Sequence, residues 1–119
     1  MYIERSEPMA GKFEVYKDKG GEFRFSLKAS NGQAILASEG YKTKPSCLSG
    51  VESVKKNATN DSLYERKQTA SGKHMFNLKA TNGQVIGTSE LYESVASRDN
   101  GIESVKKNAP EAAVNDTTA

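Results

Sequence analysis

The residues that could do chemistry are few and scattered along this chain of 119 residues. His74 is the only histidine and Cys47 is the only cysteine. A catalytic dyad or a metal centre needs several His, Cys, Asp or Glu side chains at suitable spacing, and the sequence holds no such cluster. We therefore expect a non-enzymatic protein, with no catalytic, cofactor-binding or metal-binding residues.

The glycines do not form a phosphate-binding loop. Gly20-Gly21 and Asn31-Gly32 stand between strand-like segments. A phosphate loop instead needs Lys and Ser or Thr after its glycines, at the start of a helix. We interpret these glycines as turn residues.

An internal repeat sets the positions of all these residues. Shifted by 51 positions, residues 13–58 align with residues 64–109 without a gap, and about 22 of the 46 positions are identical. The best-matched tracts are LKA-x-NGQ and ESVKKNA. A fixed period indicates one supersecondary unit used twice. Cys47 matches Arg98, so the unit does not need a thiol, although a thiol near a helix N-terminus can have a lowered pKa and serve redox sensing.

Alternating apolar residues predict three strands in each unit. Phe23, Phe25 and Leu27 alternate with polar residues, which is the period of a half-buried strand. A three-residue loop at residues 30–32 would pair Leu27 with Ile35. It would also place its closing glycine, and the matching Gly83, at positive φ.

Each unit then continues into an amphipathic helix. Thr43 and Ser94 are the expected N-caps, and Asn57 and Asn108 are the expected C-terminal caps. Glycine recurs in the middle of both helices, where it costs roughly 1 kcal/mol relative to alanine. We therefore expect each helix to approach the sheet closely at that point.

The tracts F-x-F-x-LKA-x-NGQ-x-I, SE-x-Y and GIESVKKNA resemble the YegP-like family of small bacterial proteins, grouped as a domain of unknown function. The resemblance covers residues 13–109. It implies an α+β fold in which tandem β-β-β-α(-β) repeats form one antiparallel sheet, with two helices packed on one face and terminal strands exchanged between repeats. Residues 63–68 would link the halves as a strand, and residues near 112–117 would form a last strand beside residues 13–17. The composition of that tail alone predicts disorder.

We expect the chain to form a single structural domain. Residues 1–11 would be a flexible N-terminal extension, 12–60 repeat 1, 61–110 repeat 2, and 111–119 a C-terminal tail or last strand. Apolar content is only 35% and mean hydropathy is −0.69, so one repeat alone would bury too small a core. We therefore expect a monomer with internal pseudo-two-fold symmetry.

If both helices cover one side, the other side is an open sheet about six strands wide. Polar residues recur on that side: Glu14 matches Glu65, and Lys28 matches Lys79. We interpret them first as cross-strand ion pairs. The leading functional hypothesis is that this open face contacts an unknown protein partner. The candidate face residues are Tyr16, Arg24, Lys28, Leu36, Lys67, Met75 and Lys79.

Two further hypotheses remain open. Basic and aromatic groups on an open sheet can bind single-stranded nucleic acid, although the net charge is only +2 and aromatic residues are few. An enzyme would instead need a site at the seam between the repeats, near Tyr41, Tyr92 and His74. The sequence has no apolar run that predicts a signal peptide or a membrane span, so we expect a cytoplasmic protein that does not bind membranes.

Overall fold

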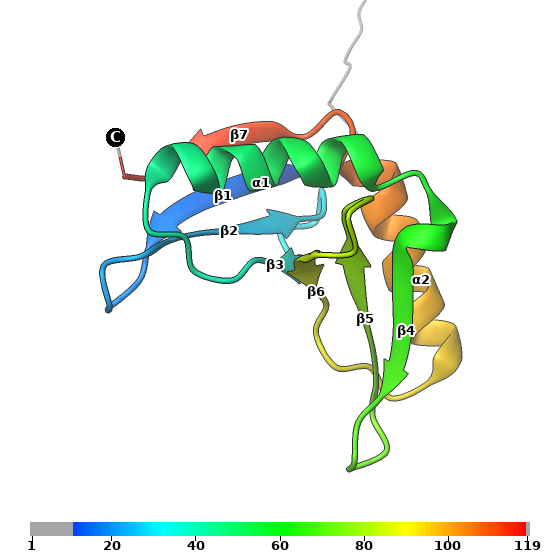
Figure 1. Ribbon diagram of the computed structural model, residues 1–119. Coiled ribbons are helices and arrows are strands. Elements are labelled where there is room, and N and C mark those ends of the chain that lie inside the picture. Colours follow the sequence, from blue (N-terminus) through cyan, green and yellow to red (C-terminus); the bar gives the residue numbers. More distant parts are fainter. Residues whose placement is uncertain (1–10, 119) are drawn as a thin grey trace, which may run out of the picture.

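The computed structural model describes residues 11–118; residues 1–10, which hold most of the expected N-terminal extension, and residue 119 lie outside that range. In the described part, seven strands form one sheet and two helices pack on one of its faces (Figure 1). The elements are β1 (Lys12–Lys17), β2 (Phe23–Lys28), β3 (Ala34–Ala37), α1 (Lys44–Asn57), a 3₁₀ turn η1 (Asp61–Leu63), β4 (Tyr64–Gln68), β5 (His74–Lys79), β6 (Val85–Thr88), α2 (Val95–Asn108) and β7 (Ala113–Asp116).

The sheet runs without interruption through both repeats, in the order β4-β5-β6-β3-β2-β1-β7. Its two halves meet where Ala37 of β3 pairs with Thr88 of β6. These residues are equivalent in the repeat, so the pseudo-two-fold axis passes between them. The expected fold class is confirmed. The sheet has seven strands, and it is mixed because β7 lies parallel to β1.

The last strand crosses from the second repeat to the first. β7 follows α2 but pairs with β1, so it lies far in sequence from its neighbour (Figure 1). The backbone N–H of Thr117 donates to the carbonyl of Val15 at 2.9 Å, and its hydroxyl donates to the same oxygen at 2.7 Å. This strand is the one implied by the family resemblance, and the disorder predicted from composition is wrong. Amino-acid composition could not reveal this strand, because its hydrogen-bonding partners on β1 lie about a hundred residues away in the sequence.

The core lies between the helices and the sheet and is shared by both repeats. Phe13 meets Phe25 edge to face at a ring-centroid distance of 5.8 Å, and Tyr64 meets Phe76 in the same way at 5.6 Å. Burying one such side chain fully contributes about 1.5–3 kcal/mol. α1 packs on β2 and on β6 of the other repeat, and α2 packs on β5 and β3. Each helix therefore joins the two halves.

The turn between β2 and β3 has the predicted glycine geometry but not the predicted register. Gly32 and Gly83 have φ values of +88° and +89°, as expected. Leu27, however, pairs with Leu36, because the register shifts by one residue and Ile35 lies in a bulge. Ile35 and Leu36 are both buried as a result. The predicted Leu27–Ile35 pair is therefore wrong, and Leu36 belongs to the core rather than to the open face.

The helices begin at the predicted N-caps. The side chains of Thr43 and Ser94 accept hydrogen bonds from backbone N–H groups three residues further on. The predicted C-caps are wrong by one residue, because the capping residue is the alanine that follows each asparagine. The Asn57 amide instead donates to the carbonyl of Ser53 at 2.8 Å, inside the last turn.

The glycines in the middle of the helices make room for tyrosines. A Cβ on Gly50 would lie 2.5 Å from the hydroxyl of Tyr41, and a Cβ on Gly101 would lie 2.4 Å from the hydroxyl of Tyr92. Each tyrosine ring also stacks on the central phenylalanine of β2 or β5, at a centroid distance of 6.4 Å. The close approach predicted from the glycines is thus confirmed. None of the described helices is long and apolar enough to cross a membrane.

Candidate interaction surfaces

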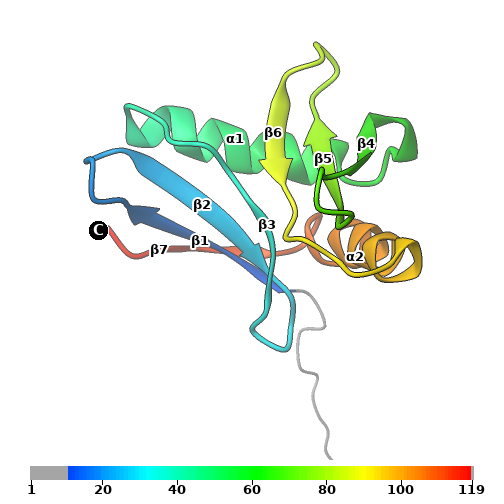
Figure 2. The ribbon, with the colours of Figure 1, turned by 90° about the horizontal axis from the view of Figure 1, so that it is seen from below.

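The side of the sheet opposite the helices holds six of the seven predicted face residues. Tyr16 lies opposite Arg24 across the β1–β2 pair, and Lys67 lies opposite Met75 across the β4–β5 pair. Opposed residues point to the same side of a sheet, and so do residues four apart on one strand. Figure 2 shows this side, with β2, β3 and β6 in front of α1. The six residues on it are Tyr16, Arg24, Lys28, Lys67, Met75 and Lys79, and Leu36 is the exception.

Ion pairs neutralise much of the charge of this face in the first repeat. The Lys28 ammonium lies 2.8 Å from the Glu14 carboxylate, and Lys12 lies 3.7 Å from it. The hydrogen bond from Lys28 holds the pKa of Glu14 below its ordinary value. Arg24 donates to Asp18 at 2.6 Å, which likewise lowers the pKa of that carboxyl group.

The second repeat builds the equivalent cluster on Glu65. Its carboxylate accepts a hydrogen bond from the Asn77 amide at 3.1 Å and lies 3.5 Å from the Lys79 ammonium. The Asn77 hydrogen bond and the Lys79 charge lower the pKa of Glu65. The interpretation of these recurring residues as cross-strand ion pairs is confirmed. The residues left over are Tyr16, which is 37% exposed, the half-buried Met75, and Lys67, which forms no ion pair within residues 11–118.

An open hollow of about 520 Å³ lies on this face beside the pseudo-two-fold axis. It is lined by residues of β2, by the segment after β3 and by the end of β6. Arg24 forms one wall, and its guanidinium donates to the Ser38 carbonyl at 3.4 Å. Glu22 and Glu39 line the same hollow, so both signs of charge are present.

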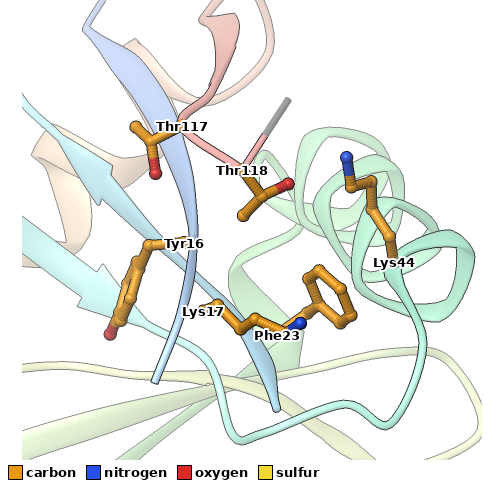
Figure 3. A pocket seen from close by; sticks show the side chains of 6 residues that line it. All are labelled: Tyr16, Lys17, Phe23, Lys44, Thr117 and Thr118. Atoms are coloured by element: carbon orange, nitrogen blue, oxygen red, sulfur yellow. The ribbon is translucent and has the colours of Figure 1, made fainter. Parts of the chain in front are cut away.

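A second hollow of about 430 Å³ lies where β1, β2, α1 and the end of β7 meet (Figure 3). The Lys17 ammonium is 5.2 Å from the centre of the Phe23 ring, and Lys44 donates to the Asp116 carboxylate at 2.9 Å. Figure 3 shows Tyr16 on the other side of β1 from Phe23. Sequence reasoning missed this hollow because Thr117 and Thr118, from the far end of the chain, line it.

The residues proposed for an enzyme site at the seam are not gathered into one group. Tyr41 forms a strand bridge with Phe23, and Tyr92 forms the equivalent bridge with His74 in the other repeat. Cys47 is fully buried in α1, and this burial raises the pKa of its thiol rather than lowering it. Among the described residues, no group of three His, Cys, Asp or Glu side chains could hold a metal ion.

Comparison with known proteins gives a consistent picture. A UPF0339 protein from the ptx operon 5′ region of Stutzerimonas stutzeri is 69% identical over 106 residues, which are 89% of this chain and 96% of the relative. The UPF0339 protein YegP of Escherichia coli K12 is 47% identical over 110 residues, which are 92% and 100% of the two chains. The NMR structure of yegP from E. coli, a protein of unknown function, matches with a TM-score of 0.88 at 46% identity, over 94% of this chain and 97% of the other.

A second NMR structure, of a UPF0339 protein from Shewanella oneidensis, matches with a TM-score of 0.86 at 44% identity, over 91% of this chain and 92% of the other. The family model described as Domain of unknown function (DUF1508) matches twice, at residues 18–65 and 70–116. Both repeats of the fold are therefore units of this family, and the resemblance seen in the sequence is confirmed. The chain belongs to the DUF1508 family of bacterial UPF0339 proteins.

Proposed function

We propose that this protein is a non-enzymatic, cytoplasmic interaction module that contacts a protein partner through the helix-free face of its sheet. The observation that supports this proposal is the exposure of the helix-free side, where Tyr16 and Lys67 are exposed and Met75 is half-buried. An exposed aromatic and a methionine within a polar surround are the residue types enriched at the centres of protein interfaces.

The charge pattern of the face favours a protein over a nucleic acid. Nucleic-acid binding depends on cations that can release counterions from phosphates. Here Lys28, Lys79 and Arg24 already lie against Glu14, Glu65 and Asp18. A surface of alternating, internally paired charges complements another protein surface of mixed charge.

A comparison of capture experiments tests this proposal. The tagged protein is used to capture partners from lysate of its own host, alongside a variant with Tyr16→Ser and Met75→Ser. Val95→Ser is the matched control, because Val95 is equally an exposed apolar residue but lies at the start of α2, on the helix side. We expect a partner that is retained by the control and lost by the face variant.

Other outcomes would overturn the proposal. If all three proteins retained the partner equally, the binding site would lie outside the helix-free face. Loss of the captured material after nuclease treatment, together with a steep salt dependence, would favour the single-stranded nucleic-acid hypothesis. Turnover of a substrate panel by metal-free protein would favour an enzyme.

A further inference from the structure

Two matching hollows lie on the helix side, each between a helix of one repeat and a turn of the other. The first, of about 310 Å³, lies between α1 and the β5–β6 turn; the second, of about 430 Å³, lies between α2 and the β2–β3 turn. Their walls are equivalent residue by residue under the shift of 51 positions. In the first hollow the argument uses Glu52, Ser53, Lys56, Asn57, Thr81 and Asn82, and in the second Glu103, Ser104, Lys107, Asn108, Ser30 and Asn31.

The charged residues of these walls recur although no core packing requires them. Glu52 and Lys56, like Glu103 and Lys107, are exposed. Some other surface positions of the same helices differ between the repeats, as where Pro45 matches Ala96, although Lys55, outside the hollow, also recurs as Lys106. Residues four apart lie on the same helix face, so each hollow presents one carboxylate and one ammonium side by side. Among the ion pairs of residues 11–118, neither Lys56 nor Lys107 takes part, whereas Glu103 lies 3.3 Å from the Lys106 ammonium.

The turns contribute amide donors at the opposite wall. The Oδ1 atoms of Asn31 and Asn82 accept the backbone N–H two residues further on, at 3.0 and 2.9 Å. This hydrogen bond orients each asparagine side chain so that its NH₂ group remains available as a donor. Neither NH₂ group donates to any residue in the described range. Each hollow therefore has a fixed donor from one repeat facing charges from the other.

A buried acceptor in the second hollow adds an independent observation. Asn108 is only 5% exposed, and its amide nitrogen donates to the Ser104 carbonyl and hydroxyl at 2.8 and 3.1 Å. This network assigns the other amide atom as the oxygen. That oxygen is buried and receives no hydrogen bond from the described part of the chain. A buried acceptor without a donor is costly and rare, and the residue that carries it lines the second hollow.

We propose that each hollow binds a zwitterionic small molecule about the size of a free amino acid. Its ammonium group lies toward Glu52 or Glu103. Its anionic group lies toward Lys56 or Lys107 and accepts from the amide of Asn82 or Asn31. The protein thus has two equivalent sites, each completed by both repeats. These sites are distinct from the helix-free face, so the proposal stands or falls separately from the proposed protein partner.

The experiment follows side-chain amide signals of the full-length protein by NMR. Pools of free L-amino acids that together cover the common set are added at millimolar concentration, with methylamine and acetate as single-charge controls. We expect the signals of Asn57 and Asn82 in the first hollow, and of Asn31 and Asn108 in the second, to shift and saturate. The pool that causes the shifts is then resolved into its members.

Variants separate the two sites. Glu52→Gln with Lys56→Gln should abolish the shifts in the first hollow and leave those in the second, and Glu103→Gln with Lys107→Gln should do the reverse. Lys55→Gln is the matched control, since it removes a neighbouring charge on α1 outside the hollow. The proposal is overturned if no pool shifts these signals, if methylamine or acetate alone reproduces the shifts, or if the variants leave them unchanged in a spectrum that is otherwise native.

Discussion

Leu36 fills the space in which a side chain on Gly87 would stand. A Cβ built on Gly87 would lie 2.6 Å from Cδ2 of Leu36 and 2.7 Å from its Cγ. The two residues are equivalent in the repeat and lie next to the pseudo-two-fold axis, beside the Ala37–Thr88 pair. Two leucines at this position would compete for the same space, so the duplication departs from exact symmetry here.

Replacing Gly87 should therefore strain the centre of the molecule. We expect Gly87→Ala to lower the free energy of unfolding by about 1–3 kcal/mol, the usual cost of an overpacked core. Urea unfolding followed by circular dichroism measures it. An unchanged midpoint would show that Leu36 can move aside without cost.

Exchanging the two residues provides the control. Leu36→Gly alone removes a buried leucine, and truncating a buried leucine even to alanine costs about 2–5 kcal/mol. Combined with Gly87→Leu, the loss should be clearly smaller than the sum of the two single changes, because the new leucine fills the vacated space from the other side of the axis. Additive losses would contradict this explanation of the Leu36–Gly87 pair.

The glycine in α1 should behave differently from a glycine on an open helix surface. Gly50→Ala gains about 1 kcal/mol in helix propensity, but its Cβ would lie 2.5 Å from the Tyr41 hydroxyl. We expect a net loss of about 1–2 kcal/mol in the free energy of unfolding. Adding Tyr41→Phe removes the closest atom and should recover part of this loss in the same urea measurement. Greater stability of Gly50→Ala alone would show that the ring shifts easily.

Acid should release the last strand before it unfolds the core. Hydrogen bonds from Thr118 and Lys44 lower the pKa of Asp116 to about 2 in the folded protein, from an ordinary value of 3.8. Because the folded pKa is depressed, this group stabilises the fold above pH 3.8, and its contribution is lost as the pH falls toward 2. NMR signals of Val15 and Thr117 should report the release over this range. Asp116→Asn should remove this pH dependence, and a variant that kept it would contradict the assignment.

Neither repeat should fold alone. Each helix packs on strands of both repeats, and β7 of the second repeat closes β1 of the first. We expect fragments separated between Asn60 and Asp61 to lack a cooperative thermal transition at high dilution, and to regain it when mixed. Calorimetry of each fragment measures this, and a cooperatively melting single fragment would contradict the shared core.

Local chemistry was the part of the fold that the sequence predicted well. Phe25 and Leu27 lie on the buried face as their alternation indicates, Gly32 adopts positive φ, and Thr43 caps α1. Each of these features depends on a few neighbouring residues. Leu36 was assigned to the wrong face because a bulge at Ile35 changes the parity of β3, and a single residue of slip inverts every side chain after it.

Reasoning from neighbouring residues could not predict sites that form between distant segments. Five of the six face residues could be predicted because their strands alternate clearly, and Lys67 because it is equivalent to Tyr16 in the repeat. The hollows at Asn57 and Asn108 could not, because each joins a helix of one repeat to a turn of the other. A signal was nevertheless present in the sequence. Glu52 and Lys56 recur as Glu103 and Lys107 on exposed surfaces, and repetition without burial calls for an explanation other than packing.

The pairing of β7 with β1 has a consequence for the order of events during synthesis. The ribosome makes β1 about a hundred residues before β7, yet these two strands are neighbours. The outer edge of β1 must therefore remain unpaired until β7 has emerged from the exit tunnel. During that interval a nascent chain nearby could supply the missing strand, so crowding on a polysome favours intertwined molecules over separate ones.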